Sequence, residues 1–245
     1  MGFIVAIDGP AGSGKGTVTK IIAEKENLIA IDTGAMYRCV ALNCLEKNIK
    51  ETDIEGVENV LEKIKIEFKN NNGKQKVLLN DKDVTEDIRT TKVDSVVAKY
   101  AALKCVRAKL TPMQQKMGEE QDIIMEGRDI GTTVFPNADV KIFLECSTEE
   151  RAKRRYIQNQ EKGITCTYNE ILKEIIERNK LETEREISPF VKAEDAIEVD
   201  STNLTIEQVV DEIIKIIKLK KEEKIWWKIK ISNQAKLEKK LQEQL

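Results

Sequence analysis

The sequence contains no histidine, and this absence removes several classes of enzyme. A Ser-His-Asp or Cys-His catalytic centre and a histidine-ligated metal site are excluded, because each requires an imidazole. Acid–base catalysis by a side chain that ordinarily titrates near neutral pH is excluded for the same reason.

Paired cysteines and long apolar runs are also lacking. The cysteines are odd in number and none are spaced as CxxC, which favours a reduced, intracellular protein with thiols in its core. The apolar run 3–7 is too short for a signal peptide or a membrane span. We therefore expect a cytoplasmic protein.

The charges nearly balance over the whole chain but not along it. The 245 residues include 41 Lys plus Arg and 43 Asp plus Glu, for a net charge of −2. Residues 220–245 hold eight lysines against four glutamates, or +4, which leaves the rest at −6. With 40% hydrophobic residues the chain can bury a core, and its length suits one α/β domain with insertions. The net charge gives no overall attraction to nucleic acid.

Short β-branched runs alternate with helical patterns. Residues 3–7 read as a buried strand, and a glycine-rich turn and a helix lead to a second strand at 28–31, which makes a βαβ unit. Three further strands are expected at 122–125, 140–144 and 196–199. The economical architecture is a three-layer α/β fold with a parallel central sheet flanked by helices.

Two segments interrupt this core. Residues 36–118 are mostly helical but contain two alternating runs, 65–69 and 75–79, joined through Asn-Gly, which predicts a β-hairpin in an inserted lobe. Residues 148–187 predict two charged helices with a break at Gly163, begun by capping sequences at Ser147 and Thr167. The second insertion suits a mobile lid, although a solvated surface excursion is the alternative. The core is then 1–35, 119–147 and 188–219, with a basic tail at 220–245.

The glycine-rich turn has the form of a phosphate-binding loop. It lies between a strand and a helix, as such a loop requires, so backbone N–H groups and the helix N-terminus can surround phosphate oxygens. The ATP-binding residues of this loop are Gly9, Pro10, Ala11, Gly12, Ser13, Gly14, Lys15, Gly16 and Thr17. Lys15 is expected to reach the β- and γ-phosphates. The pattern GxxGxGKGT resembles the loop of nucleoside monophosphate kinases.

Magnesium is not expected to have a direct protein ligand. Gly16 stands where Ser or Thr usually ligates Mg²⁺, and the hydroxyl comes one place later, at Thr17. We expect Mg²⁺ to be bound with ATP through nucleotide oxygens and water, with Thr17 as the one protein candidate. A GTP-binding switch is disfavoured, because its NKxD motif is matched only by the sequence NKLE at 179–182.

Arginines outside the loop indicate an anionic acceptor. Transfer of a phosphoryl group to another phosphate requires their mutual repulsion to be offset, and arginine grips phosphate bidentately. The candidates are Arg38, Arg107, Arg128, Arg178 and Arg185, with Arg151, Arg154 and Arg155 in the lid. Any one of them alone would read as a surface charge.

Six segments together resemble the bacterial cytidylate kinase family, in that family's order, over about residues 3–219. They are DTGAMYR (32–38), DVTEDIRT (83–90), EGRDIGT (126–132), ADVKIFL (138–144), ERAKRR (150–155) and DSTNLTIEQ (200–208). The hairpin resembles the insertion that marks the bacterial members. The resemblance implies a P-loop kinase fold with a nucleoside monophosphate lobe at 36–118 and a lid, phosphoryl transfer from ATP to CMP or dCMP, and a monomer.

The resemblance also implies roles for individual residues. The implied CMP-binding residues are Thr33, Arg38, Arg107, Arg128, Asp129, Arg178, Glu182 and Arg185. Arg151 and Arg154 join the loop at ATP, with Arg154 or Arg155 at the transferring phosphate. The implied catalytic residues are Lys15, Arg128, Asp129, Arg155, Arg178 and Arg185.

Three positions depart from the family pattern. Ala98 stands where a serine often touches the cytosine amino group, Glu182 replaces an aspartate near the ribose, and Asn179 replaces an aspartate after Arg178. The first could relax the choice of CMP over UMP, and the second could alter the preference for ribose over deoxyribose.

Two other functions remain open from the residues alone. The loop also permits a kinase of UMP, AMP or shikimate. An ATP-dependent, nucleic-acid-associated module would use the basic tail, although no nucleic-acid partner is expected. No membrane partner is expected of the body, but the tail is undetermined: Leu237, Leu241 and Leu245 favour a helical stripe, whereas Trp227, Ile229 and Ile231 alternate as in a strand. An appended helix that packs on the core or frays, a partner-docking segment, and an anionic-membrane contact are the alternatives.

Overall fold

The computed structural model describes residues 2–71, 74–119 and 121–242. The central sheet is parallel throughout, with the order β2-β6-β1-β7-β8. Its strands are β1 (Ile4–Asp8), β2 (Ile29–Asp32), β6 (Ile123–Gly127), β7 (Val140–Glu145) and β8 (Ile197–Asp200). All five strands expected from the sequence are confirmed, and β1 occupies the centre of the sheet with the phosphate-binding loop at its carboxyl end.

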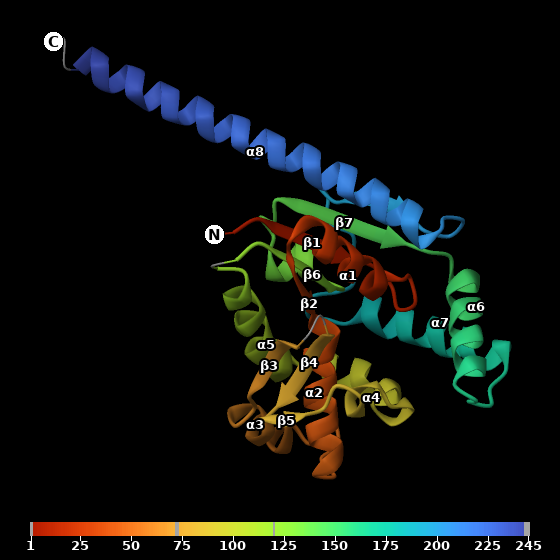
Figure 1. Ribbon diagram of the computed structural model, residues 1–245. Coiled ribbons are helices and arrows are strands. Elements are labelled where there is room, and N and C mark those ends of the chain that lie inside the picture. The colour runs from red at the N-terminus through yellow and green to blue at the C-terminus, as the bar shows by residue number, and fades with distance from the viewer. Residues whose placement is uncertain (1, 72–73, 120, 243–245) are drawn as a thin grey trace.

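Both faces of this sheet are covered (Figure 1). On one face Val5 and Ile7 pack with apolar residues of α1 (Lys15–Glu26) and α8 (Ile206–Gln242). On the other face Ile4 and Ala6 pack beneath the turn η2 (Ile130–Val134). The side chains of a strand alternate between faces, so a strand buried on both sides must be apolar at every position, as β1 is up to Asp8. The three-layer α/β fold is confirmed.

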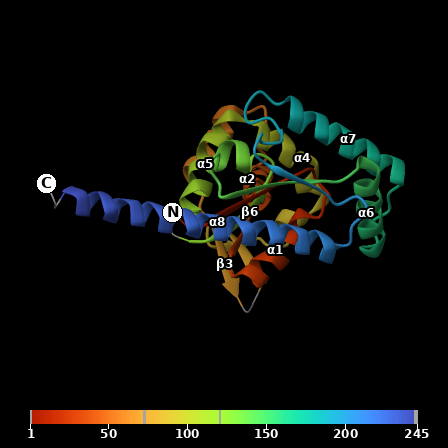
Figure 2. The same ribbon diagram turned by 90° about the horizontal axis from the view of Figure 1, so that it is seen from above.

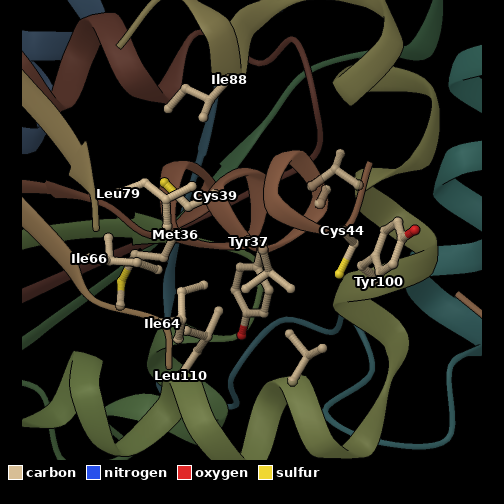
Figure 3. Close-up of a cluster of buried hydrophobic side chains, with 14 of the residues drawn as sticks. Met36, Tyr37, Cys39, Cys44, Ile64, Ile66, Leu79, Ile88, Tyr100 and Leu110 are labelled. Carbon is tan, nitrogen blue, oxygen red and sulfur yellow. The ribbon is translucent and has the colours of Figure 1, made fainter. Parts of the chain in front are cut away.

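The first insertion forms a lobe with its own core (Figure 3). Its helical elements are α2 (Thr33–Glu46), α3 (Ile54–Glu62), η1 (Asp87–Arg89), α4 (Thr91–Ala102) and α5 (Lys104–Met117). Its strands are β3 (Ile66–Asn71), β4 (Lys74–Leu79) and β5 (Lys82–Asp83), which pair antiparallel. The predicted hairpin is confirmed and β5 was not foreseen, while the Asn72-Gly73 turn lies outside the described residues. Met36, Tyr100 and Leu110 lie in this core together with the buried thiols of Cys39 and Cys44.

The second insertion is a helical hairpin, α6 (Thr148–Glu161) and α7 (Tyr168–Glu184). Both predicted caps are present: the Ser147 hydroxyl accepts from the Glu150 amide at 3.2 Å, and Thr167 forms a full capping box with Glu170. The chain turns at Gly163, whose φ of +69° favours glycine. A small apolar cluster of Ala152, Ile171 and Ile175 holds the two helices together. The two-helix prediction with its break is confirmed.

The last helix, α8, continues without interruption into the tail (Figures 1 and 2). Thr205 caps it, since its hydroxyl accepts from the Gln208 amide at 3.2 Å. The strand-like alternative for residues 227–231 is therefore wrong, because i,i+4 hydrogen bonding continues through this segment as one helix. Leu237 and Leu241 have helical backbone, whereas Leu245 lies outside the described residues. Within the part of the chain that the structure describes, no helix combines the length and the apolar character needed to cross a bilayer.

Candidate active site

The phosphate-binding loop turns between β1 and α1 with two residues in left-handed conformations. These are Gly12 (φ +82°) and Gly14 (φ +91°), where an L side chain would be strained. Lys15 begins α1 and is only 6% exposed, and its ammonium donates to the Pro10 carbonyl at 2.8 Å. Desolvation, followed by the charge of Arg128, lowers the pKa of Lys15 to about 7. The loop thus places one cationic side chain at the edge of the sheet, where phosphates would restore its charge.

Two carboxylates lie beside this lysine. Asp8 accepts from the amides of Ile130 and Gly131 at 2.9 and 2.8 Å, and desolvation raises its pKa to about 6. Desolvation and then the nearby Asp32 raise the pKa of Glu126 to about 7. Asp8 and Glu126 were missed from the sequence. The signal was their position, because both lie at the carboxyl ends of adjacent parallel strands, where ligands of open α/β sheets bind.

The same carboxylate explains the glycine at position 16. A Cβ built on Gly16 would lie 3.0 Å from Glu126 Oε1, which is closer than most real Cβ contacts. A serine or threonine there would therefore crowd Glu126. Thr17 is exposed in the first turn of α1. Among the residues that the structure describes, no group of three or more acidic or cysteine side chains is arranged to hold a metal ion.

Arg128 and Arg178 converge on one buried carboxylate. Glu182 accepts from Arg128 Nε at 2.8 Å and from Arg178 Nε at 2.9 Å, and its side chain is 7% exposed. Desolvation alone would raise the pKa of Glu182, but the two guanidinium groups outweigh it and lower the pKa to about 2. The charge of Arg178 also acts on Arg38 from α2. Three arginines from separate segments of the chain therefore share one small region.

A second buried network surrounds Asp129. Its carboxylate pairs with Arg107 at 2.8 Å and with Arg185 at 3.3 Å, and all three side chains are at most 5% exposed. Arg107 also contacts the Tyr37 hydroxyl at 3.3 Å. Its Nε has no hydrogen-bond partner among the described residues. A buried donor without a partner is costly, so this edge of the network suits a polar ligand. Just before Asp129 in the chain, the Glu126 carbonyl accepts a hydrogen bond from the Thr33 hydroxyl at 2.7 Å.

Asp94 joins the lobe to the helical hairpin of α6 and α7. One carboxylate oxygen accepts from Arg38 at 2.5 Å, and the other accepts from Arg155 of α6 at 2.7 Å. Desolvation opposes the charge on Asp94, but Arg38 and Arg155 outweigh it and lower its pKa. The same nitrogen of Arg38, Nη1, contacts both Asp94 and the Ile88 carbonyl. Asp94 was missed from the sequence, where it reads as an ordinary charge in the first turn of a helix.

Arg151 and Arg154 connect α6 to the phosphate-binding loop. Arg151 is 3% exposed and donates to the carbonyls of Ala11 and Cys146 and to Asn179. Arg154 donates to the Ser201 carbonyl at 2.8 Å and lies at hydrogen-bond distance from the Ser13 carbonyl. A cavity of about 440 Å³ opens beside them. Among the residues that line it are Pro10, Arg151, Asn179, Phe190, Asp200 and Thr202.

The structure thus brings the predicted residues into two adjoining regions. Arg151 and Arg154 lie at the phosphate-binding loop. Thr33, Arg38 and the Glu182 and Asp129 networks lie between the lobe, the sheet and the helical hairpin of α6 and α7. Ala98 is partly buried on α4, one turn after Asp94.

Comparison with known proteins identifies the family of this chain. The sequence model of the cytidylate kinases matches residues 5–219. A cytidylate kinase from Bacillus subtilis (strain 168) is 48% identical over 88% of this chain and 96% of its own length. One from Carboxydothermus hydrogenoformans is 49% identical over 87% of this chain and 96% of its own. One from Fusobacterium nucleatum is 48% identical over 88% and 97%. The family match ends where the basic tail begins.

Proposed function

The chain belongs to the cytidylate kinase family and transfers a phosphoryl group from ATP to CMP and dCMP, and we propose that the arginine networks around Lys15 hold the two substrates for this transfer. Arg38, Arg128 and Arg178 hold the CMP phosphate. Arg107 and Asp129 bind the cytosine edge, while Thr33, Glu182 and Arg185 lie at the nucleoside and the transfer zone. The observation that supports this assignment is the convergence of Arg128 and Arg178 on Glu182, within the electrostatic reach of Lys15.

On the ATP side, the loop from Gly9 to Thr17 surrounds the phosphates. Lys15 leaves the Pro10 carbonyl for the β- and γ-phosphates, and Arg155 contacts the γ-phosphoryl group in transit. Arg151 and Arg154 act near the nucleotide by fixing the loop from the lid side, because they donate to the loop carbonyls of Ala11 and Ser13.

The chemical step needs little from the protein besides positioning and charge. An oxygen of the CMP phosphate attacks the γ-phosphorus in line, and the bond from that phosphorus to the β–γ bridging oxygen breaks, which leaves ADP and CDP. A phosphate dianion is already a nucleophile, so no general base is required. The lack of histidine is consistent with this step. Lys15, Arg128, Asp129, Arg155, Arg178 and Arg185 are the residues that we expect to position groups and stabilise charge.

Magnesium is proposed to accompany ATP. The residues present fit a metal ion that is bound through water and nucleotide oxygens. Asp8 and Glu126 supply hard carboxylate oxygens beside Lys15, and the Thr17 hydroxyl is exposed nearby in the sequence. When bound, Mg²⁺ neutralises charge on the β- and γ-phosphates. Glu126 and Asp8 would orient water around it, since Gly16 leaves the Glu126 carboxylate close to the loop.

A substrate panel tests the assignment of Lys15 and of the acceptor. ADP production is followed with MgATP and CMP, dCMP, UMP or AMP in turn. Lys15→Ala should remain folded by circular dichroism while transfer falls by several powers of ten. Near-normal turnover by this variant would refute the role of Lys15. The second candidate function is a kinase that accepts both CMP and UMP, and comparable turnover of UMP would support it. It is favoured by Ala98, which stands where the family pattern often has a serine.

We further propose a monomer that works in the cytoplasm. The buried free thiols of Cys39, Cys44 and Cys146 support a reducing compartment. Light scattering at working concentration checks the mass, and a dimer mass would contradict the first part.

A further inference from the structure

The helix α8 changes its surroundings along its length. Its first part is packed on the sheet, with Val210, Ile213 and Ile217 fully buried. Lys224 marks the last described contact with the body, where its ammonium lies 2.6 Å from Asp139 and 5.4 Å from the Phe3 ring. Beyond this point the helix extends away from the rest of the molecule (Figures 1 and 2).

Large apolar side chains are exposed where the helix leaves the body. Leu219 is 61% exposed, Ile225 58%, Trp226 57% and Trp227 54%. The two indole rings meet edge to face at 5.5 Å, and Lys230 lies 5.0 Å from the centre of each ring. Adjacent exposed aliphatic and aromatic side chains are unusual on a helix in water, and they mark a surface that binds something.

Charge selects among the possible occupants. Residues 220–245 carry +4, whereas the body carries −6. Pairing with the same segment of a second copy would bring two +4 helices together, so like charges oppose it. A nucleic acid would match the charge, but it would leave Leu219 and Ile225 in water. A surface of anionic lipids matches both properties, because it offers phosphate groups for lysine and an apolar boundary for tryptophan and aliphatic side chains.

We propose that residues 219–242 of α8 bind the surface of anionic lipid bilayers and hold the kinase there. The helix lies in the plane of the interface, with Trp226 and Trp227 at the level of the lipid headgroups and the lysines against lipid phosphates. The active site is carried by the body and needs no part of this contact. The inference is independent of the roles assigned to the substrate-binding residues.

The sequence offers a direct probe, since both tryptophans of the chain lie in this segment. Full-length protein is mixed with vesicles of phosphatidylcholine, or of phosphatidylcholine with 30% phosphatidylglycerol, and tryptophan emission and co-sedimentation are measured. We expect a blue shift and sedimentation with the anionic vesicles only. Both should weaken severalfold at 0.5 M NaCl, because salt screens the lysines.

Two variants separate the contribution of the lysine charges from that of the tryptophan side chains. Replacing Lys228, Lys230 and Lys236 with Gln lowers the net charge of residues 220–245 from +4 to +1 and should abolish the blue shift while both tryptophans remain. Trp226→Ala with Trp227→Ala should lower sedimentation at least tenfold. Both variants should phosphorylate CMP at the normal rate, which shows that they are folded.

Three outcomes would overturn the proposal. One is the absence of any blue shift or sedimentation with anionic vesicles. Another is a dimer mass by light scattering with emission already blue-shifted before vesicles are added, which would indicate pairing of two copies. The third is binding to polyuridylate at physiological salt without vesicle binding, which would assign the segment to nucleic acid.

Discussion

The carboxylate of Glu182 provides a quantitative test of the site, because it compensates Arg128 and Arg178 at 2.8 and 2.9 Å. Glu182→Gln keeps the shape and removes the charge, so it imitates the protonated acid. The two arginines lower the pKa of Glu182 from 4.5 to about 2 against desolvation. Such a drop corresponds to about 3 kcal/mol of native-state stability at neutral pH. The group is almost fully buried, so solvent screening reduces this figure little.

We therefore expect Glu182→Gln to lower the free energy of unfolding at pH 7 by about 3 kcal/mol, and Tm by roughly 10 °C. Urea unfolding followed by circular dichroism measures the first quantity. The control is Glu184→Gln, the same change two residues along α7 at an exposed position. That variant should differ from the wild type by less than about 0.5 kcal/mol.

The pH dependence distinguishes a charge effect from simple loss of packing. A carboxylate with a depressed folded-state pKa contributes stability that is fully present above its unfolded value of 4.5 and lost as pH falls through about 2. The difference between wild type and Glu182→Gln should thus be constant above pH 5.5 and shrink steadily as pH falls from 4.5 towards 2. A loss below about 1 kcal/mol at pH 7, or a difference that is the same at pH 7 and pH 3, would refute the reasoning.

Three further predictions concern catalysis and binding. Asp94→Asn removes the charge that joins Arg38 to Arg155, so kcat should fall about tenfold with little change in the KM for ATP; an unchanged kcat in steady-state assays would contradict this role. Because the pKa of Lys15 is about 7 before nucleotide binds, ATP binding at pH 8 should take up close to one proton. Calorimetry in buffers of different ionisation enthalpy measures this uptake, which should vanish in Lys15→Met, and equal uptake by both proteins would be contrary to expectation. Ala98→Ser should raise the ratio of kcat/KM for CMP over UMP about tenfold through one added hydrogen bond, and an unchanged ratio would place the cytosine edge elsewhere.

The elements that are local in sequence were predictable. The phosphate-binding loop, the hairpin strands and the caps at Ser147 and Thr167 each depend on residues a few positions apart, so short patterns carry the information. The central strands were predictable because burial on both faces leaves a continuous apolar run. The order β2-β6-β1-β7-β8 was not, since residues 28–31 and 122–125 pair in the sheet although the whole lobe lies between them in the sequence.

The acceptor arginines were predicted from their positions in the sequence and from the family resemblance, but their carboxylate partners were not. Asp94 meets Arg155 across 61 positions, and Glu182 meets Arg128 across 54. An acidic residue in a charged helix looks the same in sequence whether it faces water or a guanidinium group. Likewise Gly16 was recognised as a departure, but its physical cause, the Glu126 carboxylate close to where a Cβ would be, appears only in three dimensions.

The sequence by itself determined the chemistry: a loop for phosphates, cations for an anionic acceptor and no imidazole. These follow from residue types and short spacings. Only the tertiary structure decided which carboxylate neutralises which arginine, which cations are engaged in holding the loop, and where α8 leaves the body with its tryptophans exposed. Those properties depend on distances between segments far apart in the chain, and electrostatic and hydrophobic free energies are set by such distances and by burial rather than by order along the chain.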